Sequence, residues 1–495
     1  MPRTSDPGRE RGVSTPAHRA PQDGTTTAAA SHREGGRDGD GPRENGRSDG
    51  RHGGDLRSVD SSACSEATQS RVVVVGASAA GLSTVEALRQ QGHRGPVTLV
   101  GAEPWAPYDR PPLSKHLLTL VATAQGARHP GTDADSPSAR TKSLDGAWKQ
   151  VRLRSGEELT ELGVQVRLGS PAVGLEVAAR RVHLADGEHL DADHVVIATG
   201  VAACGLPGTP QRPGTPPLRG VHRLRTLEDA VELGAQLRQG ARLVVVGGGL
   251  VGSEAAAVAA TLGMQVHLVH RGEQLLGHGL GASVTDFVRR LHLEHGVDVR
   301  LRTAVANIEA HAGGVRAVVL SDGTRLPADA VLMAVGSRPV VDWLSGSGLD
   351  LSDGVSCDAT LSAAEGVYAA GDVCRWPHPR TGRPARVEHR ANATEQGIHV
   401  AGRILGLHAD PFAALPYYWS EQYAASLQVH GWPQGHDEAE VVHGSPEERR
   451  FVVAYRQGPR LTAVLAVRSV KAARPWRAAL ADGASWHQAY GELAA

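Results

Sequence analysis

The chain of 495 residues has no run of about eighteen or more apolar residues, so it offers no candidate for a membrane-spanning helix. Charge of one sign is also not in excess, because 52 Lys and Arg against 53 Asp and Glu leave a formal net charge of -1 at pH 7. A chain with this balance is not expected to bind nucleic acid or an anionic membrane through its overall field. Lysine is scarce, so the few lysines stand out as candidates for specific roles.

Cysteine is scarce as well, and the four cysteines are scattered at positions 64, 204, 357 and 374. They form no CxxC pair and are not spaced like metal ligands, so we expect no metal site. Scattered thiols favour a reducing compartment, and we expect a cytoplasmic location.

Residues 1–70 nearly lack large apolar side chains and are predicted to be a disordered tail. The segment has no apolar stretch of the kind a secretory signal needs, and its acidic residues argue against an organellar transit peptide. An ordinary tail and a start codon assigned too far upstream both remain open readings.

Two glycine-rich loops, VVVVGASAAG at 72–81 and LVVVGGGLVG at 243–252, each end a buried-strand pattern and open a helical one. One such loop is a weak signal, but two indicate two dinucleotides held by one chain. The simplest chemistry for that pair is electron transfer from a nicotinamide to a flavin. The predicted contacts in these loops are Gly76, Ser78, Ala79, Gly81, Gly247, Gly249, Leu250, Val251 and Gly252.

The first loop belongs to a predicted βαβ unit with a strand at 71–76, a helix near 80–91 and a strand at 97–101. The amides at the start of that helix are placed to bind a pyrophosphate. Glu103 follows the second strand, where an acid can accept hydrogen bonds from a ribose. An ordinary surface glutamate is the alternative. Further buried strands are predicted at 194–199, 242–246 and 330–335, with strand-like runs at 451–455 and 461–467.

The segment 107–115 reads PYDRPPLSK and carries a distinctive resemblance. It resembles FAD-dependent ferredoxin reductases of the putidaredoxin-reductase and biphenyl-dioxygenase-reductase type, which have the pyridine nucleotide-disulfide oxidoreductase fold. The resemblance extends over about 71–480, apart from 121–146. It implies that Arg110 lies along the FAD and that Lys115 reaches the flavin ring near N5. A solvated helix lysine is the alternative for Lys115.

The same resemblance assigns further residues to the two nucleotides. Glu254 would lie by the nicotinamide and pair with Lys115; an N-terminal helix acid is the alternative. His270 and Arg271 stand where NADH-selective relatives usually have an acid, so NADH and NADPH both stay open. Arg271 could bind a 2′-phosphate, while nearby Glu273 argues against it. The remaining predicted cofactor contacts are Ala198, Thr199, Gly200, Arg225, Gly336, Asp372, Glu388, His389 and Arg390.

Two departures from related enzymes matter here. No cysteine lies between Cys64 and Cys204, so the redox cysteines of related disulfide reductases are missing and electrons should leave the flavin directly. Arg390 replaces the tryptophan of the family's usual EHW motif, which puts the electron exit path or the partner class in doubt. Arg390 ends a basic stretch at 375–390 that either steers an acidic ferredoxin or is a solvated loop.

We therefore expect an α/β flavoprotein with two Rossmann-like domains and a small α+β C-terminal domain. The FAD domain is expected at 71–201 and 329–409, with a flexible insertion at 121–146. The NAD(P)H domain is expected at 202–328 and the C-terminal reductase domain at 410–495. The cofactors would be FAD with NADH or NADPH. Lys115 and Glu254 are the predicted catalytic residues.

The implied activity is hydride transfer from NAD(P)H to FAD, followed by single-electron transfer to an iron–sulfur ferredoxin. That ferredoxin would serve a cytochrome P450 or a ring-hydroxylating oxygenase. The alternatives are a flavin NAD(P)H oxidase, a nitrite-reductase-type subunit and a non-catalytic redox-sensing flavoprotein. The oligomeric state, monomer or homodimer, stays open.

Overall fold

The structure, a computed structural model, describes residues 67–126, 137–205, 218–277 and 279–493. The predicted tail at 1–70 lies outside these residues except for its last four positions. Among the described residues, no helix is both long and apolar enough to cross a membrane.

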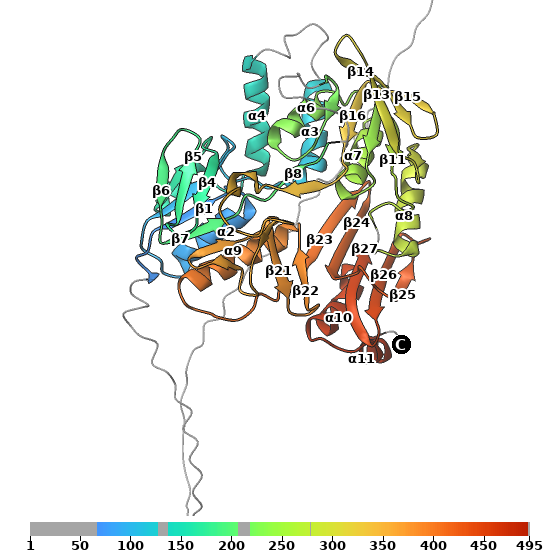
Figure 1. Cartoon of the computed structure of the whole chain (residues 1–495). Coiled ribbons are helices and arrows are strands. Elements are labelled where there is room, and N and C mark those ends of the chain that lie inside the picture. The colour runs from blue at the N-terminus through green and yellow to red at the C-terminus, as the bar shows by residue number, and fades with distance from the viewer. Residues whose placement is uncertain (1–66, 127–136, 206–217, 278, 494–495) are drawn as a thin grey trace, which may run out of the picture. The chain divides into compact units, whose positions relative to one another are not determined.

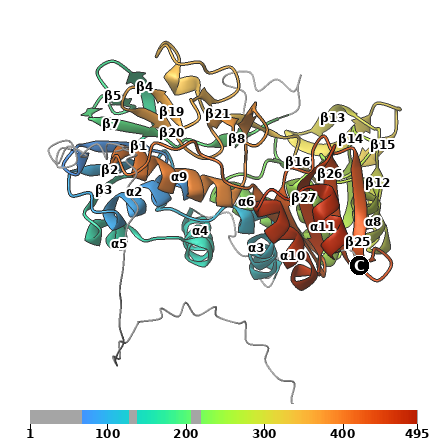
Figure 2. The ribbon, with the colours of Figure 1, turned by 90° about the horizontal axis from the view of Figure 1, so that it is seen from below.

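The first sheet places the first glycine-rich loop, and its six strands run in the order β19-β20-β7-β1-β2-β3. β1 lies between β2 and β7 and is parallel to both, and its four valines are buried. Helices α2 (Ala79–Gln90) and α9 (Arg390–Ile404) lie side by side along this sheet in both views (Figures 1 and 2). The strands are β1 (Val72–Val75), β2 (Val97–Val100), β3 (Val164–Arg167), β7 (His194–Ile197), β19 (Ser362–Ala364) and β20 (Val367–Ala369).

The second sheet places the second glycine-rich loop, and its five strands run in the order β12-β11-β10-β16-β9. All four neighbouring pairs are parallel, so the carboxyl ends of the strands share one edge. The strands are β9 (Val221–His222), β10 (Arg242–Val246), β11 (Gln265–Val269), β12 (Asp298–Arg300) and β16 (Ala330–Met333). The helices of this part are α6 (Leu227–Gly234), α7 (Leu250–Thr261) and α8 (Ala282–Glu294).

The third sheet is antiparallel and follows the order β23-β24-β27-β26-β25. One of its faces contributes Phe451, which meets Phe287 of α8 edge to face at 5.4 Å between ring centroids. Its other face is covered by the last two helices, whose Trp476 is buried (Figure 1). These elements are β23 (Tyr417–Gln422), β24 (Ala425–Gly431), β25 (Glu438–Ser445), β26 (Arg450–Gln457), β27 (Arg460–Val467), α10 (Val470–Ala481) and α11 (Trp486–Leu493).

Shorter sheets and helices complete the described chain. Strand β8 pairs with β17 where the chain passes between the first two sheets. The other small sheets are β4-β5-β6, β13-β14-β15 and β18-β21-β22. These strands are β4 (Ala172–Glu176), β5 (Arg181–Leu184), β6 (His189–Asp191), β8 (Val201–Ala203), β13 (Val305–His311), β14 (Gly314–Leu320), β15 (Arg325–Pro327), β17 (Ser337–Pro339), β18 (Val355–Ser356), β21 (Cys374–His378) and β22 (Arg383–Arg386). The remaining helices are the 3-10 turns η1 (Pro111–Ser114) and η2 (Asp342–Leu344), with α3 (His116–Gly126), α4 (Pro137–Val151) and α5 (Gly156–Glu161).

The predicted α/β class and the strands expected from the sequence are confirmed, because each expected run overlaps an observed strand. Two details differ. Strand β16 pairs with β10 and β9, so residues 330–333 belong to the second sheet and not, as expected, to the FAD-binding part. The expected insertion 121–146 is helical at both ends, in α3 and α4, because buried residues of both helices join a core with α6; its centre lies outside the described residues.

Candidate active site

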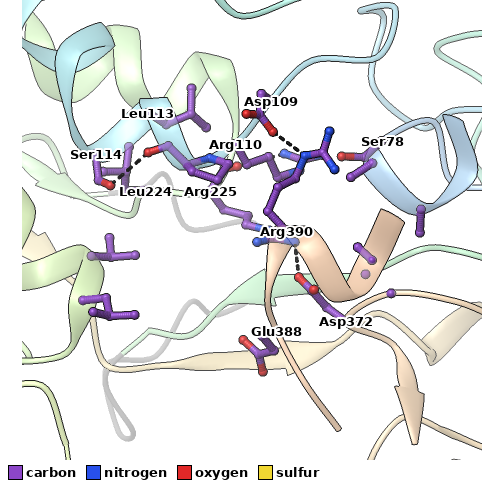
Figure 3. A pocket seen from close by; sticks show the side chains of 18 of the residues that line it. Ser78, Asp109, Arg110, Leu113, Ser114, Leu224, Arg225, Asp372, Glu388 and Arg390 are labelled. Atoms are coloured by element: carbon purple, nitrogen blue, oxygen red, sulfur yellow. Dashed lines mark hydrogen bonds and ion pairs between the residues drawn. The ribbon is translucent and has the colours of Figure 1, made fainter. Parts of the chain in front are cut away.

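A cavity lies where the first sheet's glycine-rich loop, the turn η1 and the N-termini of α7 and α9 meet (Figure 3). Elements more than 250 residues apart in the chain therefore build one site. Thirteen of the sequence-predicted residues line it: Ser78, Ala79, Arg110, Lys115, Ala198, Gly200, Arg225, Leu250, Val251, Glu254, Asp372, Glu388 and Arg390.

The first loop is shaped for close backbone approach. Gly76 has φ +123°, and a Cβ there would lie 2.1 Å from the carbonyl oxygen of Ala198, so a side chain at this position would clash with the neighbouring strand end. Ser78 is the N-cap of α2, but its side chain makes no capping hydrogen bond. The first amides of α2 are therefore left without a side-chain cap and can donate to an anion.

Three arginines from separate segments converge on the cavity (Figure 3). Arg225 donates through Nη2 to Oδ2 of Asp372 at 3.0 Å, and Arg390 donates through Nε to Oδ1 of Asp109 at 2.6 Å. Burial raises the pKa of Asp372, while Arg225 acts in the opposite direction. The arrangement is a partly buried cationic lining with matched acids, which suits a phosphate-bearing ligand.

Arg110 is fixed by a local network that the sequence did not indicate. Its Nη2 donates to Oε1 of Glu103 at 2.6 Å, and its Nη1 donates to the hydroxyl of Tyr108 at 2.9 Å. Although burial acts to lower it, Tyr108 and Glu103 raise the pKa of Arg110. Glu103 does not line the cavity, and its carboxylate also accepts from the Tyr108 hydroxyl. Its contact to a ribose stays a prediction.

Glu254 is the centre of the second network. Its carboxylate accepts from Lys115 Nζ at 2.8 Å, from Ser114 Oγ at 2.5 Å and from Ser420 Oγ at 2.7 Å. Glu254 is 2% exposed, so its carboxylate has lost almost all of its hydrating water. The three hydrogen bonds from the protein compensate for this loss. Lys115 also donates to the carbonyl oxygen of Pro111 at 3.1 Å. The predicted pair of Lys115 and Glu254 is therefore present in the structure.

Sequence reasoning missed the two serines of this network. Ser420 belongs to β23, so the C-terminal sheet reaches Glu254 directly. Its hydroxyl in turn accepts from Gln422 Nε2 at 3.2 Å, and Gln422 Oε1 lies 3.1 Å from Nε2 of buried His292. A buried serine gives no pattern in a single sequence, and the only local signal beside Ser420 is the cluster of Tyr and Trp residues at 417–423.

Glu388, His389 and Arg390 stand at the start of α9, where the family's usual motif is EHW. Their side chains have different surroundings. Glu388 lines the cavity, accepting from Ser337 Oγ and from Arg386 Nη1, both at 2.6 Å. His389 does not line it, and its ring lies 4.6 Å from that of Tyr418. Burial lowers the pKa of His389 to about 4, so the ring is neutral near pH 7. Arg390 is the only cation of the three at that pH.

Three of the five arginines in the basic stretch at 375–390 are paired with acidic side chains in the structure. The carboxylate of Asp353 forms ion pairs with Nε of Arg386 at 2.9 Å and with Nε of Arg375 at 4.0 Å. Arg390 forms an ion pair with Asp109. Burial also lowers the pKa of His378, which keeps this ring neutral. The stretch therefore offers less free positive charge to an acidic partner than its composition suggests.

A second cavity lies at the carboxyl edge of the second sheet. It is lined by the loop after β10 and by the ends of β11 and β16, including the predicted residues Gly247, Gly249, His270, Arg271 and Gly336. The amide of Gly248 donates to Nδ1 of His270 at 3.2 Å, so this nitrogen faces the loop. Arg271 is exposed at the rim. Glu273, the acid that argued against NADPH, lies 3.2 Å from Arg302.

Six predicted residues line neither cavity. Gly81 and Gly252 lie at the helix–strand contacts, where an added Cβ would approach a backbone oxygen to 1.9 Å in each case. Thr199 donates to the carbonyl oxygen of Val340 at 2.7 Å, which ties the two crossing segments together. The six are Gly76, Gly81, Glu103, Thr199, Gly252 and His389.

The residues present fit two dinucleotides. Both glycine loops open helices whose N-caps, Ser78 and Gly249, make no side-chain capping bond, and Arg110, paired with Glu103, supplies a fixed cation in the first cavity. Residues 247–249 line the second cavity and Leu250, Val251 and Glu254 line the first, so one loop-to-helix segment borders both cavities. No cysteine is found among the described residues that line the first cavity, and the described residues contain no metal-binding cluster.

Comparison with known proteins agrees with this geometry. Residues 70–397 match the pyridine nucleotide-disulphide oxidoreductase family, and residues 417–490 match the reductase C-terminal family. The chain is 33% identical to putidaredoxin reductase of Pseudomonas putida over 79% of this chain and 87% of that protein. It is 35% identical to the ferredoxin–NAD(+) reductase component of the anthranilate 1,2-dioxygenase system of Burkholderia cepacia, over 81% of this chain and 92% of that protein.

A solved structure of the covalent putidaredoxin reductase–putidaredoxin complex matches with a TM-score of 0.74 and 31% identity. It covers 84% of this chain and 93% of the matched chain. The resemblance drawn from the PYDRPPLSK motif is therefore confirmed. The chain belongs to the pyridine nucleotide-disulphide oxidoreductase family, among its FAD-dependent ferredoxin–NAD(P)+ reductases.

Proposed function

We propose that this protein carries electrons from NAD(P)H through FAD to an iron–sulfur ferredoxin, with FAD in the first cavity and the nicotinamide nucleotide in the second. The observation that carries the proposal is the Lys115–Glu254 pair. Glu254 lies near the N-terminus of α7, whose first residues line the first cavity, and the glycine loop that leads into α7 lines the second. Bound FAD accepts a hydride from a nicotinamide and releases electrons one at a time.

The chain's own residues hold the reactants and set the charge around them. Lys115 supplies a fixed cation, and Glu254 with Ser114 and Ser420 fixes the position of its ammonium group. No side chain has to gain or lose a proton for hydride transfer, so orientation and fixed charge set the rate. Arg110 and Arg225 hold the phosphate-bearing parts of the FAD, and the uncapped amides of α2 bind its pyrophosphate.

The partner proposal rests on the relatives. The matched solved structure contains putidaredoxin, and other relatives are named as components of dioxygenase systems. We propose an iron–sulfur ferredoxin as the electron acceptor here, with a terminal oxygenase or cytochrome P450 served indirectly. We further propose that Arg390, at the cavity and paired with Asp109, takes the place of the family's aromatic contact. The three described cysteines are free thiols, which supports the cytoplasmic location we propose.

NADPH is the nicotinamide nucleotide that we propose. Arg271 is exposed at the rim of the second cavity, at the end of β11 where the ribose of a bound dinucleotide lies. Glu273 is engaged by Arg302 and leaves Arg271 to contact a 2′-phosphate.

The proposal is tested by purifying the protein with its flavin and supplying NADPH and a [2Fe–2S] ferredoxin. We expect reduction of cytochrome c that depends on the ferredoxin, with little hydrogen peroxide. Rapid peroxide production without ferredoxin would point instead to the oxidase alternative.

A further inference from the structure

Two cysteines from neighbouring strands are in contact next to the segment that carries Asp372. Cys357 directly follows β18 and Cys374 begins β21, and their Sγ atoms lie 3.8 Å apart. The two strands are parallel, and the Cys357 amide donates to the carbonyl oxygen of Arg375 at 2.8 Å. Strand pairing therefore holds the sulfurs together.

The two thiols differ in access. Cys374 is fully buried, and burial raises the pKa of its thiol. Cys357 is only partly buried, so it is the more accessible of the two residues to a small oxidant. A reachable thiol in contact with a shielded one is the arrangement in which an oxidised first sulfur is captured by the second.

Cys374 also belongs to a tight turn. Its amide donates to the carbonyl oxygen of Gly371 at 2.9 Å, and Asp372 lies between them. The Val355 amide donates to the carbonyl oxygen of Val373 at 2.8 Å, which joins the turn to β18. Cys374 therefore shares this turn with Asp372, whose carboxylate pairs with Arg225 in the first cavity.

We propose that Cys357 and Cys374 form a peroxide-sensitive dithiol whose oxidation to a disulfide loosens the cofactor cavity at Asp372. Hydrogen peroxide is the oxidant. The Cys357 thiolate attacks one peroxide oxygen, the O–O bond breaks, and the departing hydroxide takes up a proton to leave as water. Cys374 Sγ then attacks Cys357 Sγ, and its proton leaves with the displaced hydroxide as a second water. Two thiols are oxidised and one peroxide is reduced to two waters.

Loosening follows from geometry. A disulfide brings its sulfurs to about 2.05 Å, which is well below the present separation. Cys374 is held in the turn at 371–374 by its hydrogen bond to Gly371, so the share of this approach that Cys374 makes also displaces the turn. The effect on the cofactor rests on the proposed placement of FAD beside Asp372, whereas disulfide formation does not.

The test uses the full-length flavoprotein, treated with hydrogen peroxide and then with an alkylating agent. We expect a peptide linking Cys357 to Cys374 that lacks two hydrogen atoms and disappears on reduction. We also expect FAD release, followed by ultrafiltration, to become about tenfold faster, as when a hydrogen bond to a charged group is weakened. Cys357→Ser should abolish both effects, and Cys204→Ser, at another partly buried thiol, should keep both.

Absence of the linked peptide overturns the proposal. A linked peptide with unchanged FAD release overturns the coupling to the cavity, as does faster release in Cys357→Ser. A preparation that binds no FAD would instead contradict the proposed function. The peptide map can still be read in that case, so the two failures are distinguishable.

Discussion

The ammonium group of Lys115 lies 2.8 Å from a carboxylate oxygen of Glu254, although 139 residues separate the two in the chain. Their side chains are 10% and 2% exposed, so the ion pair is shielded from solvent, and both residues line the first cavity. Charge-assisted hydrogen bonds are stronger when they are removed from water. This pair is the feature on which we base the placement of hydride transfer.

Replacing Glu254 with Gln is expected to slow flavin reduction by about 10- to 100-fold, because hydrogen bonds to charged groups contribute about 1.5–3 kcal/mol. The amide keeps the shape of the side chain but removes the charge that holds Lys115. Stopped-flow absorbance of the flavin under anaerobic conditions measures the rate. The matched control is Glu421→Gln, an exposed glutamate on β23, which should reduce at the unaltered rate. Equal rates of flavin reduction in the two variants would show that Glu254 has no role in this step.

Ser420 is expected to act as a positioning residue through Glu254. Ser420→Ala removes one of three donors to the carboxylate, so flavin reduction should slow by about threefold to tenfold, less than in Glu254→Gln. Ser420→Thr retains the hydroxyl and should restore most of the rate. Ser426→Ala on β24 is the control. If flavin reduction slows by the same factor in the alanine and threonine variants, the hydroxyl group of Ser420 does not contribute to the rate.

Arg271→Ala tests the nucleotide preference. Loss of the guanidinium should raise KM for NADPH by about tenfold while KM for NADH changes little, since one charge-assisted contact to the 2′-phosphate is removed. Steady-state kinetics with each nucleotide give both values. Arg316→Ala, an exposed arginine on β14, should change neither. A parallel rise for both nucleotides would contradict a specific 2′-phosphate contact.

His292 is expected to make the fold sensitive to acid. Burial, with His295 adding to it, lowers the pKa of His292 to about 4, below its ordinary value of 6.5. The unfolded chain therefore binds this proton first, and stability falls as pH drops from about 6.5 toward 4. Between pH 7 and pH 5 the loss attributable to His292 is about 2 kcal/mol in the free energy of unfolding.

Urea unfolding of the native protein and His292→Gln at pH 7 and pH 5 measures this loss. The variant should lose less stability between the two pH values than the native protein. His487→Gln, at an exposed histidine, should lose as much as the native protein. An unchanged pH dependence in His292→Gln would show that other groups govern acid unfolding.

Local patterns were sufficient for the glycine loops and their strands. Valine runs ending in glycine predicted β1 and β10 closely, because a buried parallel strand and its turn are written in adjacent residues. Pairings across long distances were not predictable. Arg390 reaches Asp109 across 281 residues, and Ser420 reaches Glu254 from another sheet. Such contacts depend on how whole sheets pack, which a single sequence does not display.

The measurement that tests the central claim most directly is anaerobic stopped-flow reduction of the flavin with NADPH and with NADH, followed by mixing with an oxidised [2Fe–2S] ferredoxin. The account predicts rapid bleaching of the flavin band, faster with NADPH, and then reduction of the ferredoxin. Rapid bleaching by NADH alone would retain the reductase and discard the role of Arg271. A yellow protein that neither nucleotide reduces quickly would contradict the account.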